Sequence, residues 1–114
     1  MKISIIIPAY NSERTLVNTI KYIFNSKITD FEIIIVDDFS TKKIKDYIKN
    51  NKVKIFRNKR NMGPSYSRNI GAQKAKGEIL LFLDSDIYIK KNTLFKIIEI
   101  FKKKSIDVLV GLFD

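Results

Sequence analysis

Three short and nearly continuous apolar runs constrain the fold of this chain more than any other feature of its sequence. The runs lie at residues 3–7, 31–36 and 78–83. Runs of this length without polar alternation are typical of strands that are buried on both faces of a sheet. The segments between them are long enough for helices and carry apolar residues at helical spacing, as Leu16, Ile20 and Phe24 do. The sequence therefore predicts strands that alternate with helices.

The remaining elements complete this alternation. A first helix is expected to end near Phe24, with Asn11 or Ser12 as its cap and Glu13 close to its positive end. Further helices are expected near residues 44–48, 65–76 and 94–101, and weaker strands at residues 53–56 and 107–111. Short connections between such elements imply right-handed crossovers. We therefore expect one α/β domain over residues 1–114, a three-layer, mostly parallel sheet with helices on both faces.

The composition excludes several kinds of chemistry. The chain has no His and no Cys, so disulfides, thiolate nucleophiles, zinc sites of the usual kind and Ser-His-Asp triads are ruled out. Any metal ion would have to be bound by carboxylates. No apolar run is long enough to cross a bilayer, and the first run is interrupted by Pro8 too soon for a signal peptide. We expect a cytoplasmic protein without a transmembrane segment.

The formal net charge of +10 allows two interpretations. It is compatible with an anionic partner such as nucleic acid, a nucleotide or an acidic membrane surface. Most of the cations are lysines spread along polar helix faces, which favours an ordinary solvated surface over a dedicated nucleic-acid face. The charge alone does not identify a partner.

A loop segment with polar residues follows each of the first four predicted strands. These segments occupy residues 8–11, 37–38, 57–63 and 84–86. Parallel sheets bind their ligands at the carboxyl ends of the strands. If the sheet is parallel, these four segments meet at one edge, and residues far apart in sequence can form one site.

Asp84-Ser85-Asp86 is the most informative of these segments. In an extended turn, residues two apart point the same way, so both carboxylates could face one cation. Such oxygens suit Mg²⁺ or Mn²⁺ bound to phosphate. The alternative is an acidic turn that caps the next helix. The wholly apolar strand before it, and the second acidic pair Asp37-Asp38 at the same edge, favour the metal.

The other segments suggest how a nucleotide could be held. Asp37 or Asp38 could accept a hydrogen bond from an N–H of a planar heterocycle such as uracil, although the pair could also form a second metal site. Tyr10 could lie against such a ring, or simply pack over its own loop. Arg68 and the cations at residues 57–60 could neutralise a diphosphate, while surface solvation explains the loop cations equally well.

Four blocks of the chain resemble the family 2 glycosyltransferases of the GT-A fold, and they occur in the order and spacing of that family. The blocks are IIIPAYN at residues 5–11, VDDFS at 36–40, NMGPSYSRNIG at 61–71 and GEILLFLDSD at 77–86, the last ending in a DxD motif. Jointly they are specific, whereas each alone would be weak. Two residues depart from the family pattern: Phe39 replaces a small residue, and Ser67 replaces an Ala.

The resemblance implies a Rossmann-like domain that binds a nucleotide-sugar donor, a UDP-sugar in the first place. It implies that Asp86 is the principal ligand of a Mn²⁺ or Mg²⁺ ion that bridges the diphosphate, and that Asp84 approaches the metal or the ribose. Of the Asp37/Asp38 pair, Asp38 is preferred as the uracil contact. The other residues that the resemblance places beside the nucleotide are Pro8, Ala9, Tyr10, Glu13, Gly63 and Arg68.

The resemblance also implies inverting transfer to an acceptor, a sugar, lipid or protein that the residues do not identify. The family takes its general base from an acidic motif in the acceptor-binding half, which is expected beyond Asp114, so no catalytic base is assigned here. Asp107 and Asp114 are poor substitutes by position. The chain thus looks like the donor half of a larger, here shortened, enzyme. Uncovered apolar surface could drive homo-oligomer formation or contact with a membrane edge.

Three other interpretations fit less well. A receiver-like phosphoacceptor domain needs its acidic pair after the first strand, whereas the acidic groups here follow the second and fourth. A dinucleotide-binding module needs glycines in the turn after the first strand, and residues 8–11 contain none. A non-catalytic nucleic-acid-binding domain fits the charge and leaves the carboxylates unexplained; steep salt dependence of DNA binding, without any response to metal or nucleotide, would favour it.

Overall fold

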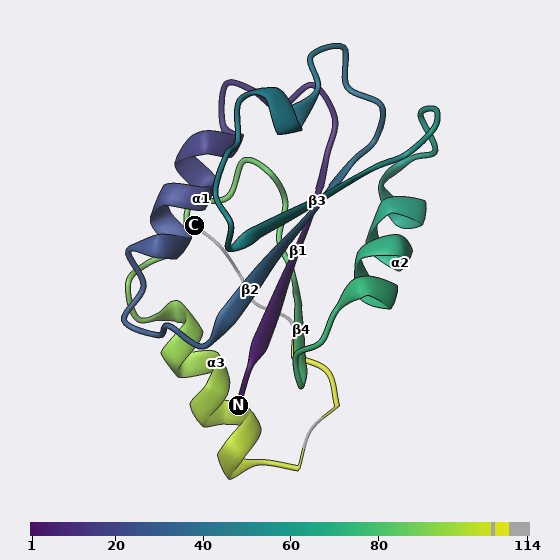
Figure 1. The fold of residues 1–114 in the computed structure, drawn as a ribbon. Helices are drawn as coiled ribbons and strands as arrows, with labels where there is room; N and C mark the ends of the chain where they lie inside the picture. The colour runs from purple at the N-terminus through teal and green to yellow at the C-terminus, as the bar shows by residue number, and fades with distance from the viewer. Residues whose placement is uncertain (106, 110–114) are drawn as a thin grey trace.

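Four parallel strands form the centre of the molecule, in the order β3-β2-β1-β4. The structure is a computed structural model that describes residues 1–105 and 107–109. Figure 1 shows the sheet with α1 and α3 on one side and α2 on the other. The strands are β1 (Ile3–Ala9), β2 (Phe31–Asp37), β3 (Val53–Arg57) and β4 (Ile79–Phe82). The helices are α1 (Leu16–Phe24), α2 (Pro64–Lys74), α3 (Thr93–Lys103) and the single 3₁₀ turn η1 (Ile44–Asp46). The predicted three-layer α/β fold is confirmed.

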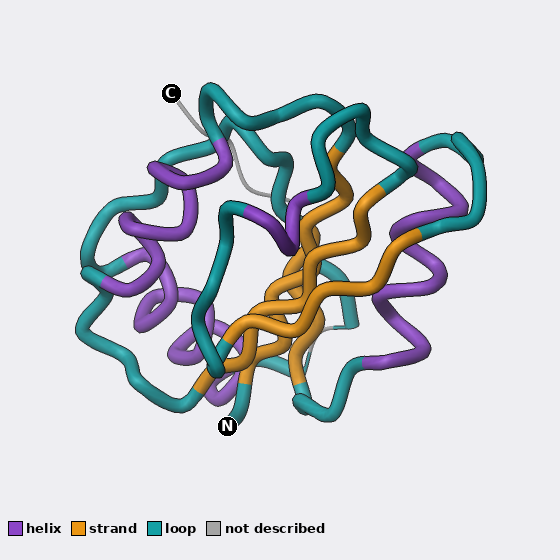
Figure 2. The backbone as a smooth tube through the Cα atoms, turned by 45° about the horizontal axis from the view of Figure 1, so that its top comes forward, coloured by secondary structure: helices purple, strands orange, loops and turns teal. Residues whose placement is uncertain are grey.

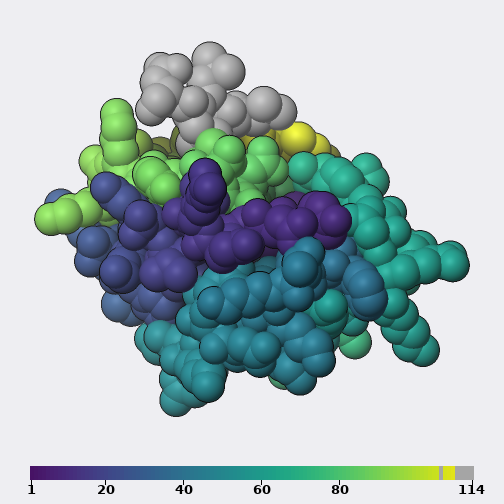
Figure 3. Space-filling view, turned by 90° about the horizontal axis from the view of Figure 1, so that it is seen from above, coloured from purple at the N-terminus to yellow at the C-terminus, as the bar shows by residue number. Residues whose placement is uncertain are grey.

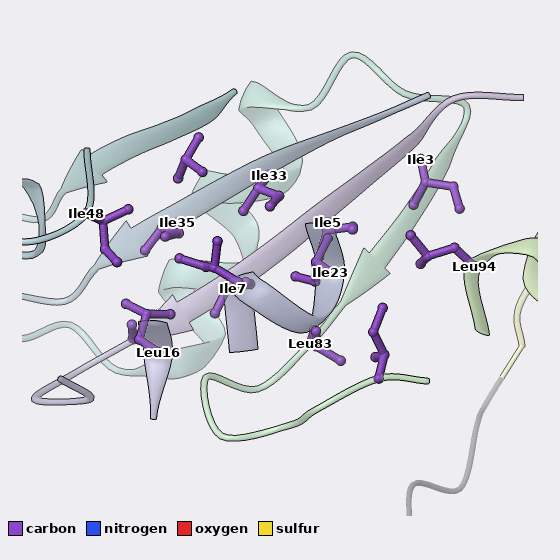
Figure 4. Close-up of a cluster of buried hydrophobic side chains, with 14 of the residues drawn as sticks. Ile3, Ile5, Ile7, Leu16, Ile23, Ile33, Ile35, Ile48, Leu83 and Leu94 are labelled. Atoms are coloured by element: carbon purple, nitrogen blue, oxygen red, sulfur yellow. The ribbon is translucent and has the colours of Figure 1, made fainter. Parts of the chain in front are cut away.

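Burial on both faces of the sheet explains the unbroken apolar runs. In β1, Ile5 and Ile7 point into a large core beneath α1, α3 and η1, while Ile6 points into a smaller core beneath α2. All three side chains are fully buried. Figure 2 shows the strands running between the two helical layers, and Figure 4 shows the larger core. A strand covered on both sides has no solvent face, so polar alternation is absent.

Helix α2 lies unusually close to the central strand. A Cβ atom at Gly71 would overlap the buried Cγ2 of Ile6, so this position needs a residue without a side chain. Gly77, after the helix, has no room for a side chain either, because a Cβ there would lie 2.6 Å from Ser4 Oγ. The two glycines therefore allow α2 and the segment leading to β4 to pack directly against β1.

Helix α1 begins later than the sequence predicts. Neither Asn11 nor Ser12 caps it: the N-cap is Thr15, which makes no capping hydrogen bond through its side chain. The Asn11 side chain instead accepts a hydrogen bond from the Thr41 backbone at 2.9 Å, and Ser12 Oγ donates to the Tyr10 carbonyl at 3.2 Å. Asn11 thus joins its loop to the turn after β2, whereas Ser12 bonds within its own loop. Residues 12–15 form a turn before the helix.

The C-terminal part of the predicted pattern differs from the structure. Residues 107–109 of the predicted fifth strand are not in a strand, and residues 110–111 lie outside the described residues. In the described part of the chain β4 is therefore an edge strand, with Leu80 and Phe82 each more than two-fifths exposed. A groove of about 910 Å³ runs between β4, α3 and residues 107–109. No helix within residues 1–105 is long and apolar enough to span a membrane.

A buried polar network ties β1, β2, β3 and the segment before β4 together. Glu32 is 5% exposed, and its Oε2 accepts hydrogen bonds from Ser4 Oγ at 2.6 Å and from the Lys76 backbone at 2.7 Å. Its Oε1 accepts from Lys54 Nζ at 3.2 Å. Burial raises the pKa of Glu32, but these hydrogen bonds outweigh it and lower the pKa from 4.5 to about 2. The ionised form is therefore the one that the fold stabilises.

This shift predicts a pH-dependent stability. Because the folded pKa lies below the ordinary value, the contribution of Glu32 is complete above about pH 4.5 and is lost as the pH falls towards about 2. It amounts to about 3 kcal/mol in the free energy of unfolding. We expect wild type to exceed Glu32→Gln in stability at pH 7, by a margin that urea titrations find constant down to about pH 5 and smaller at pH 3. A margin that is still unchanged at pH 3 would contradict the prediction.

Candidate functional site

A pocket of about 470 Å³ opens at the carboxyl edge of the sheet, between the ends of β1 and β4. The strand order reverses there: β1 leads outwards to β2, whereas β4 lies on the other side of β1. Crevices at such reversals are where open parallel sheets bind ligands. Figure 3 looks down on this edge, with the purple segment after β1 between the green segment after β4 and the blue segment after β2. The lining residues are Pro8, Asn11, Ser12, Glu13, Arg14, Thr15, Pro64, Arg68, Asp84, Ser85 and Asp86.

All three residues of the Asp84-Ser85-Asp86 turn line this pocket. Thr19 Oγ1 donates a hydrogen bond to the Ser85 carbonyl at 2.8 Å, and the hydroxyls of Ser85 and Ser12 are also 2.8 Å apart. These contacts hold the turn against α1 and the segment after β1. Asp84 and Asp86 are exposed, so both can reach a ligand in solution.

Two carboxylates suit a cation that is shared with a phosphate. The described residues contain no group of three or more acidic side chains that could hold a metal ion by themselves. Mg²⁺ in proteins is commonly bound by one or two carboxylates together with water and substrate phosphates. The donor set of Asp84 and Asp86 fits that arrangement, in which the ligand itself completes the coordination.

Arg68 connects α2 to this turn. Its Nη2 donates to Asp84 Oδ1 at 3.3 Å, in an ion pair whose two side chains are 38% and 64% exposed. Pairs as exposed as this contribute little to stability. The pair therefore leaves both partners available to a ligand, and Asp86 is in none of the ion pairs found among the described residues.

Asp38 lies beneath the edge and anchors the loop that leads to α2. It is 4% exposed; its Oδ1 accepts from Asn58 Nδ2 at 2.9 Å and from the Met62 backbone at 2.7 Å, and its Oδ2 accepts from the Gly63 backbone at 2.9 Å. Asn58 Nδ2 also donates to Ser67 Oγ at 3.0 Å. A carboxylate has about four acceptor positions, so one direction at Oδ2 is left for a further donor.

Asp37 has a different role from its neighbour. It is 1% exposed and accepts from the backbones of Ser40 at 2.9 Å and Ile44 at 3.1 Å and from Arg57 Nη1 at 2.9 Å. Burial raises the pKa of Asp37, but hydrogen bonds from Ser40, Ile44 and Arg57 outweigh it and hold the pKa below its ordinary value. Asp37 and Arg57 thus stabilise the turn after β2, and neither lines the pocket.

Two exposed aromatic residues emerge from adjoining turns at the same edge. Tyr10 is 51% exposed and Phe39 is 48% exposed, and the turns that carry them are joined by the hydrogen bond from the Asn11 backbone to Ser40 Oγ at 3.0 Å. Phe39 has a φ of 64°, and the guanidinium of Arg57 lies 4.6 Å from its ring centroid. This φ lies in the left-handed region, which a residue with a bulky side chain rarely adopts.

The structure thus separates the predicted site residues into two groups. Those that line the pocket are Pro8, Glu13, Arg68, Asp84 and Asp86. Those at the same edge but outside the lining are Ala9, Tyr10, Asp37, Asp38 and Gly63. Ala9 is buried and Gly63, at φ 94°, precedes the first residue of α2. Sequence reasoning missed Arg14, Asn58 and the hydrogen-bonding role of Ser67, because their positions depend on contacts between distant loops.

The ends of two helices also face the pocket. Thr15 is the N-cap of α1 and Pro64 is the first residue of α2, and both line it. Helix N-termini carry partial positive charge and favour anions. Together with Arg14 and Arg68 they offset the carboxylates, so the pocket can hold an anion and a cation side by side.

Known proteins with similar sequences are glycosyltransferases. An uncharacterized glycosyltransferase of Haemophilus influenzae is 41% identical over 99 residues, which cover 82% of this chain and 40% of the relative. The poly(ribitol-phosphate) beta-N-acetylglucosaminyltransferase TarS of Staphylococcus aureus is 36% identical over 106 residues, 82% of this chain and 18% of that protein. The chain therefore spans less than half the length of these relatives.

Solved structures agree with this relationship. The crystal structure of S. aureus TarS 1–349 in complex with UDP-GlcNAc matches with a TM-score of 0.81 and 34% identity, covering 90% of this chain and 32% of that one. A mannosyltransferase from Pyrobaculum calidifontis, in complex with GDP-Man and Mn²⁺, shares the fold with a TM-score of 0.75 at 20% identity over 81% of this chain and 30% of its own. The family model for glycosyl transferase family 2 matches residues 4–114. This chain belongs to glycosyl transferase family 2.

Proposed function

We propose that this chain binds the nucleotide-diphosphate part of a sugar donor, a UDP-sugar in the first place, with a Mn²⁺ or Mg²⁺ ion at Asp84 and Asp86, for inverting transfer of the sugar to an acceptor. One observation carries the proposal. The pocket between β1 and β4 brings together three carboxylates, two arginines and two helix N-termini. A diphosphate with a bound divalent cation fits such a pocket, because its negative oxygens can face the arginines and helix N-termini while the cation faces the carboxylates.

The chemistry follows from the leaving group. When the bond from the sugar to the diphosphate breaks, negative charge develops on the diphosphate oxygens. A bound divalent cation would offset that charge. Arg68 and the positive ends of α1 and α2 lie around the same pocket and would hold the diphosphate in place.

The nucleoside would lie above the ends of β1 and β2. Tyr10 offers an exposed ring against which a base can stack. Asp38 has one acceptor direction left at Oδ2, which could accept the N3–H of uracil. The related S. aureus TarS 1–349 was solved in complex with UDP-GlcNAc, a uridine donor, which supports this choice of nucleotide. We place the base that deprotonates the acceptor hydroxyl outside residues 1–114, in an acceptor-binding part.

Thermal-shift and calorimetric titrations with UDP test the proposal. A ligand that binds only the folded state raises the melting temperature. We expect UDP to raise it by several degrees in Mn²⁺ and by much less in EDTA, with a duplex DNA oligonucleotide as the control ligand. Equal responses to UDP with and without Mn²⁺ would contradict the metal site. Salt-sensitive binding of the DNA without any response to UDP would instead favour the nucleic-acid interpretation.

A further inference from the structure

Arg14 is a pocket residue to which neither the motifs nor the resemblance gives a role. It lies in the turn at residues 12–15, between β1 and α1, and lines the pocket. The turn is well defined, because the backbones of Thr15 and Leu16 both donate to the Ser12 carbonyl, at 3.1 and 2.9 Å. The backbone that carries Arg14 therefore has a defined place in the lining of the pocket.

Arg14 has no ion-pair partner among the described residues, although the pocket that it lines is acidic. The pocket contains three carboxylates, those of Glu13, Asp84 and Asp86. Arg14 is exposed, and among the described residues it belongs to none of the three ion pairs, whereas Arg68 is paired with Asp84. Its guanidinium donors are thus free for a ligand, in a pocket whose acids would otherwise repel an anion.

Arg14 and Arg68 approach the pocket from opposite sides. Arg14 lies in the turn before α1, which covers one face of the sheet, and Arg68 belongs to α2, which covers the other (Figure 1). A diphosphate between them would have a guanidinium on either side. The planar guanidinium can donate two parallel hydrogen bonds to two phosphate oxygens, whereas an ammonium group cannot.

We propose that Arg14 binds the diphosphate of the donor from the α1 side, as the counterpart of Arg68 on the α2 side. The proposal rests on the proposed function, since it deepens the recognition of the same ligand. It assigns Arg14 to the phosphates and leaves the nucleoside to other residues. Removal of Arg14 should therefore affect ligands with phosphate groups and spare those without them.

The test compares UDP with uridine, both in Mn²⁺, for wild type, Arg14→Ala, Arg14→Lys and the control Lys21→Ala, which removes an exposed cation of α1 outside the pocket. We expect Arg14→Ala to weaken UDP binding by about 10-fold to 100-fold. Its affinity for uridine should equal that of wild type. Arg14→Lys should recover part of the loss, and Lys21→Ala should behave as wild type.

Each other outcome has a distinct meaning. If Arg14→Ala binds UDP as tightly as wild type, Arg14 does not bind the diphosphate and the inference is wrong, while the proposed function stands. If Arg14→Ala loses uridine as well as UDP, the residue shapes the pocket and the phosphate assignment is wrong. If wild type does not bind UDP, the proposed function itself fails, and this inference fails with it.

Discussion

Replacement of Asp86 with alanine is expected to abolish the Mn²⁺-dependent part of UDP binding, with a loss of affinity of at least about 100-fold. Asp84 and Asp86 are the two carboxylates of the turn after β4 that line the pocket, and Asp84 is already paired with Arg68 at 3.3 Å. Asp86 is the one with no ion pair among the described residues. Without it, a cation would have only one carboxylate of this turn, and that one is shared with a guanidinium.

Calorimetric titration of UDP in Mn²⁺ and in EDTA measures this effect. The matched control is Asp30→Ala, which removes an exposed acid beside the opposite end of the sheet. We expect Asp86→Ala to bind UDP in Mn²⁺ no better than wild type does in EDTA, and Asp30→Ala to bind as wild type. An Asp86→Ala variant that still responds to Mn²⁺ would remove Asp86 from the metal site.

Replacement of Asp37 with alanine is expected to lower the free energy of unfolding by about 3–5 kcal/mol. The variant leaves Arg57 without its carboxylate and two backbone N–H groups, those of Ser40 and Ile44, without their acceptor. The site is 1% exposed, so water cannot replace the lost partner easily. A loss of this size is a large part of the stability of a small domain.

Urea denaturation at pH 7 checks this expectation. Asp37→Asn keeps one side-chain oxygen and should lose less, and Asp46→Ala, at an exposed acid of η1, should change stability by less than about 0.5 kcal/mol. Because the folded pKa of Asp37 is lowered, its contribution is present at neutral pH and is lost as the pH falls below the ordinary range. Asp37→Ala with nearly wild-type stability at pH 7 would show that the turn after β2 does not depend on this carboxylate.

The order of the elements could be predicted from the sequence because it depends on local patterns. Strands buried on both faces leave apolar runs such as residues 3–7, and Pro64 begins α2 where a proline at a helix start is favoured. The start of α1 could not be predicted, since Asn11 and Ser12 are good caps that the fold uses elsewhere. Local propensity identifies a possible cap, and tertiary contacts decide which residue serves.

In the candidate site, too, features set by local sequence could be predicted, and features set by tertiary contacts could not. The placement of Asp84 and Asp86 in one pocket follows from their spacing after a parallel strand, and it was predicted. The different roles of Asp37 and Asp38 could not be predicted, because the sequence does not show which hydrogen-bond partners each of two adjacent aspartates has. Those partners, such as Arg57 for Asp37 and Asn58 for Asp38, come from the end of a strand and a loop about 20 residues away.

The direct contact between α2 and the central strand has a consequence for the range of donors that such a pocket can accept. Because Gly71 packs directly against Ile6, the helix that carries Arg68 cannot move closer to β1. On the opposite side of the pocket, the turn after β4 is held by hydrogen bonds of Ser85 with the hydroxyls of Ser12 and Thr19. Such hydrogen bonds can re-form after small shifts of the backbone. Donors with sugars of different size would be accommodated on that side, and divergence in donor preference among related chains is expected to accumulate there.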